Sequence, residues 1–301
     1  MASWNELSTE ISQAIQAVGK SIVTVQPCAG RTSSGIILDE RTIITTARSV
    51  ADESSVQVWT SPDESATARL KGSDPSTDIA LLQVEKKIGP AASFIENPQA
   101  AVGQLVVAIG RTWRGNLVAS AGILSGVMGE WHTFRGGKID AFIRPDLTLY
   151  SGFSGGALIS ADQKILGMNT TSLRRGFPLT VPYATIKRVA AALAEKGYIP
   201  KPYLGLGLQP VRLPESLPQK LNLTDEMGAL VVHVEPASPA EKAGVLLGDV
   251  LLRVDGQNFA GGTASVVRRL KPNHEAEISG TRGGQAFSAS VLVGERPRRR
   301  P

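Results

Sequence analysis

The chain has 301 residues, enough for two domains, and its 42% hydrophobic and 20% charged residues are typical of a protein with a packed core. Cys28 is the single cysteine, which excludes a disulfide framework and the usual cysteine-based zinc sites. We expect no metal, no cofactor and no membrane span, since no apolar run approaches the roughly 20 residues of a span. Most of the net charge of +5 lies in a C-terminal run of four arginines: Arg296, Arg298, Arg299 and Arg300.

This basic run has no interleaved aromatic residues, and the rest of the chain is almost neutral. Nucleic-acid surfaces instead spread their positive charge over a face or along a groove. We therefore expect no nucleic-acid partner. Nucleic-acid binding through the tail stays open as a third hypothesis, which a steep salt dependence of binding would identify.

The N-terminal segment has the pattern of a helix rather than of an export signal. Apolar residues recur at helical spacing and stop at Gly19, which predicts an amphipathic helix over residues 4–18: Trp4, Leu7, Ile11, Ile15 and Val18. The segment has neither the basic start nor the continuous apolar stretch of a signal peptide. Together with the lone cysteine, this predicts a cytoplasmic protein, or a periplasmic one if a leader has been removed.

Short β-rich segments dominate the chain from residue 21 to residue 182, separated by Gly, Pro, Asp and Ser. This rhythm favours an all-β barrel or sandwich over βαβ units. Residues 183–196 predict a second helix that ends at Gly197, and the segment GYIPKPYLG that begins there is the candidate linker. Beyond it, strand-like pieces alternate with helical ones near 237–243 and 263–270, which predicts a small mixed α/β unit.

The sharpest local motif is SGFSGGAL, residues 151–158. Glycines on both sides of Ser154 allow a tight turn that presents its hydroxyl beside backbone N–H groups. Acyl transfer needs this arrangement, because the nucleophile must lie next to donors for the developing oxyanion. A glycine-rich β-turn with an incidental serine is the alternative.

The same residues also satisfy G-x-S-x-G, the nucleophile elbow of α/β-hydrolases. Asp225 and His274 would supply that family's order of acid and base after the serine. The elbow requires a helix after the serine, whereas the following residues, ALIS-ADQ-KILGMN, have the pattern of two strands joined by a turn. The context therefore disfavours the elbow.

Two further segments accompany the serine motif. DPSTDIALLQV, residues 74–84, places Asp78 directly before an apolar strand, and TIITTARSV, residues 42–50, is a strand that runs into a turn. With the serine motif they resemble the trypsin-like core of the HtrA (high-temperature-requirement) serine proteases over residues 20–190. That resemblance implies a mainly β fold with a chymotrypsin-like double six-stranded β-barrel. It also implies that Ser154 is the nucleophile, Asp78 the acid, and the N–H groups of Gly152 and Ser154 the oxyanion donors.

The C-terminal unit is similar to a PDZ domain in two places. YLGL, residues 203–206, resembles the carboxylate-binding loop, and SPAEKAGVLLGDVLLRVDGQ, residues 238–257, resembles the helix, turn and strand that follow. The resemblance implies that a C-terminal peptide binds as an added strand, its carboxylate held by four loop residues: Tyr203, Leu204, Gly205 and Leu206. An ordinary edge strand is the alternative.

This organisation predicts an N-terminal helix over 1–20, a trypsin-like domain over 21–197, a PDZ domain over 198–295 and a basic tail over 296–301. HtrA proteins commonly form trimers through N-terminal apolar side chains, so the resemblance implies a homotrimer formed through Trp4 and the apolar face of the helix. Packing of that face on its own domain is the alternative.

One position breaks the family's pattern. The catalytic histidine should stand where this chain has Arg48, and the chain's three histidines, His132, His233 and His274, lie far along the sequence. Arginine stays protonated at any working pH and cannot take a proton from Ser154. We expect Arg48 to pair with Asp78 and to exclude water from the place of the base.

The leading hypothesis is therefore a pseudoprotease with a degenerate triad, which binds peptides or unfolded proteins in a chaperone-like or regulatory role. The alternative is an active serine endopeptidase of protein quality control that recruits an unusual base. His132, in the loop GEWHTFRGG, is the candidate for that base. Labelling of Ser154 by an active-site phosphonate would favour the active enzyme.

Overall fold

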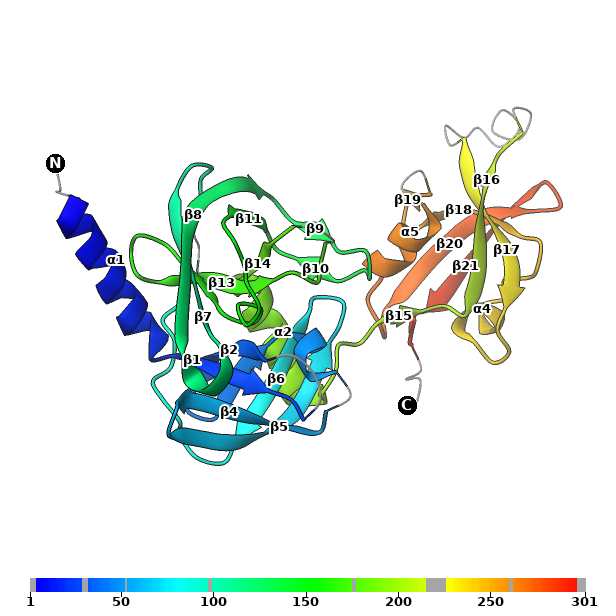
Figure 1. Ribbon diagram of the computed structural model, residues 1–301. Helices are drawn as coiled ribbons and strands as arrows, with labels where there is room; N and C mark the ends of the chain where they lie inside the picture. Colours follow the sequence, from blue (N-terminus) through cyan, green and yellow to red (C-terminus); the bar gives the residue numbers. More distant parts are fainter. Residues whose placement is uncertain are drawn as a thin grey trace. The chain divides into compact units, whose positions relative to one another are not determined.

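The structure is a computed structural model that describes residues 4–28, 32–51, 53–96, 99–174, 177–214, 226–259 and 262–296 (Figure 1). The chain divides into two compact units, Met1–Ile199 and Pro200–Pro301. In the described ranges, no helix has both the length and the hydropathy needed to cross a membrane. Most of the C-terminal basic tail lies outside these ranges.

Six antiparallel strands close the first barrel, in the order β1-β2-β3-β6-β5-β4. Its interior is filled by aliphatic side chains, among them Val23, Ile43 and Leu82. Runs of Val, Ile and Leu suit these strands because branched side chains pack well on a pleated surface. The bounds are β1 Ile22–Gln26, β2 Ser33–Asp39, β3 Thr42–Thr45, β4 Ser55–Ser61, β5 Glu64–Asp74 and β6 Ile79–Val84.

A second closed barrel follows, in the order β11-β14-β13-β12-β7-β8. A shared core joins it to the first barrel, since Ile36 and Ile79 of one pack in the same cluster as Ile109 and Met168 of the other. The double six-stranded β-barrel expected from the sequence is thereby confirmed. The bounds are β7 Leu105–Arg111, β8 Leu117–Met128, β11 Phe142–Asp146, β12 Ala157–Ile159, β13 Ile165–Thr170 and β14 Leu179–Pro182, with a side hairpin of β9 Trp131–His132 and β10 Lys138–Ile139.

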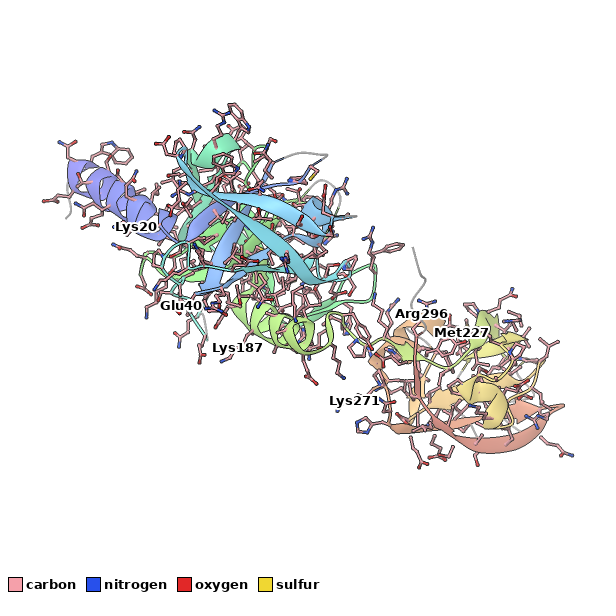
Figure 2. All side chains as sticks on the ribbon, turned by 90° about the horizontal axis from the view of Figure 1, so that it is seen from below. Lys20, Glu40, Lys187, Met227, Lys271 and Arg296 are labelled. Atoms are coloured by element: carbon pink, nitrogen blue, oxygen red, sulfur yellow. The ribbon has the colours of Figure 1, made fainter. Side chains whose placement is uncertain are left out.

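Both helices expected in this unit are present, α1 over Trp4–Gly19 and α2 over Tyr183–Lys196. The second ends as expected at Gly197, whose left-handed backbone (φ +75°) lets its N–H bond to the Leu193 carbonyl. The apolar stripe of α1 packs on the barrel core from Ile11 onward. Its N-terminal half extends into solvent (Figures 1 and 2), and Trp4 there is 82% exposed.

The C-terminal unit is a mixed α/β fold built on the sheet β16-β17-β18-β20-β21, in which β16 is an edge strand. The two helical segments expected there appear as α4, Pro239–Lys242, and α5, Thr263–Arg269. The Ser238 hydroxyl caps the first of them by accepting a bond from the Glu241 N–H. The strands are β15 Pro202–Tyr203, β16 Leu206–Arg212, β17 Met227–Val234, β18 Val250–Val254, β19 Gln257–Asn258, β20 Glu275–Arg282, β21 Gln285–Leu292 and β22 Gly294–Glu295.

Candidate functional site

The turn that carries Ser154 is fixed from the first barrel by one buried residue, Ser34 of β2. The Ser34 hydroxyl donates to the Gly152 carbonyl at 2.6 Å, and the Ser34 N–H donates to the Ser154 carbonyl at 2.8 Å. The Arg111 N–H in turn donates to the Ser34 hydroxyl at 2.8 Å. Both carbonyls of the turn are thereby held toward β2. Sequence reasoning missed Ser34, because nothing in the strand sequence SSGIILD distinguishes it from the adjacent Ser33.

Two backbone N–H groups of this turn have no acceptor. In the described part of the chain, the N–H groups of Gly152 and Ser154 form no hydrogen bond, whereas the Phe153 N–H bonds to the Tyr150 carbonyl at 3.2 Å. Gly152 has a φ of +98°, a conformation that favours glycine, and it is buried. Both N–H groups are therefore available to an acceptor outside the turn.

Asp78 is buried beside this turn, with 3% of its surface exposed and a left-handed φ of +57°. Its carboxylate accepts hydrogen bonds from the Arg48 N–H at 3.0 Å and the Thr170 hydroxyl at 2.6 Å. Burial raises its pKa, although these bonds, a bond from the Ser172 side chain and the charge of Arg48 act in the opposite direction. Sequence reasoning suggested Thr170 only as a residue lining the specificity pocket and missed its hydrogen bond to Asp78, which lies 92 residues away in the sequence.

Arg48 lies in η1, a 3-10 turn over Ala47–Val50 that follows β3. Its contact with Asp78 is through the backbone N–H, and its side chain is exposed. No ion pair joins the two side chains at bonding distance in the described structure. The expected water-excluding ion pair is therefore wrong, because an exposed guanidinium keeps more hydration than it would beside a buried carboxylate.

The Ser154 hydroxyl has one contact among the described residues, the Thr171 hydroxyl at 3.4 Å. His132 lies exposed on β9, paired with Lys138 of β10, and forms no hydrogen bond with Ser154. The elbow alternative fails on the fold, since β12 rather than a helix follows the serine. His274 belongs to the C-terminal unit, and Asp225 lies outside the described residues. Among the described residues of the N-terminal unit, no histidine or carboxylate is hydrogen-bonded to the Ser154 hydroxyl.

Replacing Asp78 by asparagine removes a carboxyl group whose ionisation costs more free energy in the folded protein than in the unfolded chain. Since burial raises the folded pKa above its unfolded value near 3.8, wild-type stability falls as pH rises through the folded pKa. We therefore expect the unfolding free energy of Asp78→Asn, relative to that of wild type, to be larger at pH 7 than at pH 4. The lower pH lies close to the ordinary pKa of an aspartate and the higher one well above it. Urea unfolding at both pH values measures this change. The exposed Asp162→Asn is the control, and an equal change in both variants would contradict the assignment.

The loop over residues 203–206 lies at the start of the edge strand β16. The Leu204 and Gly205 carbonyls bond inward, to the N–H groups of Ala240 and Glu235, while the N–H groups of Leu204 and Gly205 have no acceptor in the described residues. Gly205 needs its φ of +78°, and a Cβ there would lie 2.2 Å from Ser238 Cβ. Burial and a bond with Glu235 raise the pKa of Tyr203 to about 12.

An apolar cluster extends from this loop to α5. Leu204, Val266 and Leu270 are buried in it, with Leu206 and Leu208 of β16 packed against them. An edge strand beside an apolar helix face, with free N–H groups at its start, is the arrangement that binds an extended C-terminal peptide. The loop is thus a second candidate site.

Comparison with known domain families identifies both units. Residues 33–168 match the trypsin-like peptidase domain, and residues 202–293 match the PDZ domain. The protein therefore combines a trypsin-like peptidase domain with a PDZ domain. The fold and these matches together give it the scaffold of an HtrA-type serine endoprotease.

Individual relatives agree with that scaffold. The chain is 29% identical over 272 residues to a probable periplasmic serine endoprotease DegP-like of Halomonas elongata and 30% identical to that of Pseudomonas fulva, covering 88% of this chain and 56% of each relative. It spans about half the length of these curated relatives. Among solved structures, the HtrA-type protease AlgW with tripeptide is similar at 26% identity and a TM-score of 0.72, over 96% of this chain and 98% of that one. The serine endoprotease from Yersinia pestis shares the fold at 24% identity and a TM-score of 0.74, over 99% of both chains.

The prediction of a cytoplasmic protein is wrong in the light of these relatives, which are described as periplasmic. The prediction rested on the first residues and on the lone cysteine. Neither feature separates a cytoplasmic protein from an exported one whose leader is absent from the sequence, because the folded body needs the same core in both places.

Proposed function

We propose that this protein is an HtrA-type pseudoprotease that binds peptides or unfolded proteins without cleaving them. The observation that carries the proposal is the environment of the Ser154 hydroxyl, whose hydrogen-bond partner among the described residues is the Thr171 hydroxyl rather than a base. A serine hydroxyl is a weak nucleophile until a base removes its proton. The buried Asp78 and the glycine turn are retained, so the proposed loss is confined to the base, at Arg48.

Labelling by a fluorophosphonate tests this proposal directly, because the reagent reacts with serines that a neighbouring base activates. We expect wild type to label no faster than Ser154→Ala over hours, with a commercial trypsin-like protease as the positive control. Rapid labelling of wild type that disappears in Ser154→Ala would identify the active endopeptidase instead, and a search for its base would begin at His132.

The peptide-binding part of the proposal rests on the loop of Tyr203, Leu204, Gly205 and Leu206. Its free N–H groups and the apolar floor beside β16 suit the carboxylate and last side chain of a peptide. Two of the similar solved structures are described as holding a tripeptide and a decapeptide, which supports peptide binding here. We further propose that the protein works in the periplasm, as its relatives are described to do.

We also propose a homotrimer assembled through the N-terminal half of α1. Trp4 is 82% exposed and Leu7 36% exposed on the same apolar stripe, which the protein's own barrels leave uncovered. Sedimentation should give about three times the chain mass of 31.8 kDa, and Trp4→Glu with Leu7→Glu should reduce it to the chain mass. The control is Asn5→Asp with Ser8→Asp, which adds the same charge to exposed polar positions of that helix. A wild-type protein that sediments as a monomer would refute the trimer.

A further inference from the structure

The turn that carries Ser154 presents unpaired hydrogen-bond donors, and the exposed, positively charged Arg48 lies in η1 of the same unit. Besides the free N–H groups of Gly152 and Ser154, the turn has the half-exposed Ser154 hydroxyl, engaged by Thr171 only at 3.4 Å. Unpaired donors on one turn favour the binding of an acceptor, because a donor that is left without a hydrogen bond costs free energy.

A chain of contacts connects these donors to Arg48. The Arg48 N–H bonds to Asp78 Oδ1 at 3.0 Å, and the Thr170 hydroxyl bonds to Asp78 Oδ2 at 2.6 Å. The next residue, Thr171, reaches the Ser154 hydroxyl at 3.4 Å. Residue 48 is thereby connected to the turn that carries Ser154 through Asp78 and the adjacent residues Thr170 and Thr171.

The guanidinium of Arg48 is available to a ligand. Both Asp78 oxygens already accept hydrogen bonds from other groups, and the Arg48 side chain is exposed without an ion pair in the described structure. Arginine keeps its charge at every working pH and donates up to five N–H bonds in a planar fork that matches a carboxylate. Its bonds to an anion are also stronger than bonds between neutral groups.

We propose that the Ser154 turn and Arg48 together bind a peptide's C-terminal carboxylate, held by the Gly152 and Ser154 N–H groups and by the Arg48 guanidinium. A carboxylate has two oxygens, so one can accept from the backbone donors while the other faces Arg48. This inference deepens the proposed function and rests on it, because a site without protease activity can hold a peptide terminus without cleaving the peptide. It is a second carboxylate site, distinct from the loop of the PDZ domain.

A titration followed by amide NMR tests the proposal in the full-length protein. The probe is acetyl-Ala-Ala-Val with a free carboxylate, compared with the same tripeptide as its carboxamide. The chemical shifts of the Gly152 and Ser154 amides report binding at this turn even if the peptide also binds the PDZ domain. Wild type is compared with Arg48→Met, which removes the charge and keeps a similar length. Arg41→Met, at the opposite end of β3, is the matched control.

The carboxylate peptide should shift both amide signals of wild type and of Arg41→Met. The dissociation constant of the carboxylate peptide should be at least about tenfold higher for Arg48→Met than for wild type. The carboxamide peptide should likewise bind wild type at least about tenfold more weakly than the carboxylate peptide does. Equal binding of the two peptides, or equal binding to wild type and Arg48→Met, would overturn the proposal. Acetate or phosphate binding as tightly as the peptide would also overturn it, in favour of a simple anion site. These outcomes are distinct from failure of the proposed function, which shows as cleavage of a protein substrate that depends on Ser154.

Discussion

Replacing Arg48 by histidine is expected to give this protein protease activity. The backbone of residue 48 is fixed by its N–H bond to Asp78 Oδ1, so a histidine ring at this position begins next to the buried carboxylate. Its Nδ1–H can donate to Asp78 while Nε2 faces the Ser154 hydroxyl, as a general base requires. General-base catalysis contributes about 10²- to 10⁴-fold, and we expect a gain of at least about 100-fold in peptide hydrolysis.

Hydrolysis of an internally quenched peptide library measures this gain. Arg48→Gln is the matched variant, because it also removes the positive charge but supplies no base. The double variants Arg48→His with Ser154→Ala, and Arg48→His with Asp78→Asn, should lose the gained activity. The rate should also rise with pH through the titration range of histidine. No gain in Arg48→His would mean that more than the base has been lost from the site.

Replacing Gly155 by alanine is expected to destabilise the serine turn severely. Gly155 has a φ of +86°, and a Cβ on it would lie 2.0 Å from the Ser34 carbonyl oxygen and 2.9 Å from Thr45 Oγ1. That oxygen belongs to a strand inside a closed barrel and already accepts a 2.7 Å bond from the Thr45 hydroxyl, so it has little freedom to move. Left-handed strain and overpacking each cost about 1–3 kcal/mol, and together predict a loss of about 3 kcal/mol or more.

Two other glycines of the same domain separate these causes. Gly103 also has a positive φ, of +89°, and Gly129 does not, while neither has an atom within 4 Å of the place of a Cβ. Urea unfolding should therefore rank the variants with Gly129→Ala least affected, Gly103→Ala intermediate and Gly155→Ala lowest. A Gly155→Ala variant as stable as Gly103→Ala would show that the turn can move away from Ser34.

The elements that follow local patterns were predictable from the sequence. The spacing from Trp4 to Val18 defines α1, and the stop at Gly197 defines the end of α2, because helical periodicity and a left-handed cap are local properties. The two-barrel class followed from the rhythm of short strands combined with the resemblance of three motifs. The assignment of Ser154, Asp78 and Arg48 to their roles stays a prediction.

The roles of Ser34 and Thr170 were not predictable from the sequence, because they depend on contacts between distant parts of the chain. Ser34 bonds to the Gly152 carbonyl 118 residues away, and Thr170 bonds to Asp78 across 92 residues. No periodicity or spacing encodes such a pair, since the barrels must close before the residues meet. The exposure of Arg48 was missed for a similar reason: the residue type suggested an ion pair, whereas the turn η1 presents the backbone N–H to the carboxylate.

We propose that the protein binds without cleaving because no base activates Ser154. The most direct test of this proposal compares the hydrolysis of casein by wild type and by Ser154→Ala, at equal concentration and over a day at 37 °C. Under these conditions, the catalysis that remains in a protease without its triad, about 10³-fold over water, stays below detection. We expect the two proteins to be indistinguishable and casein to stay intact with both. Cleavage by wild type that disappears in Ser154→Ala would contradict it and show that another group activates the serine.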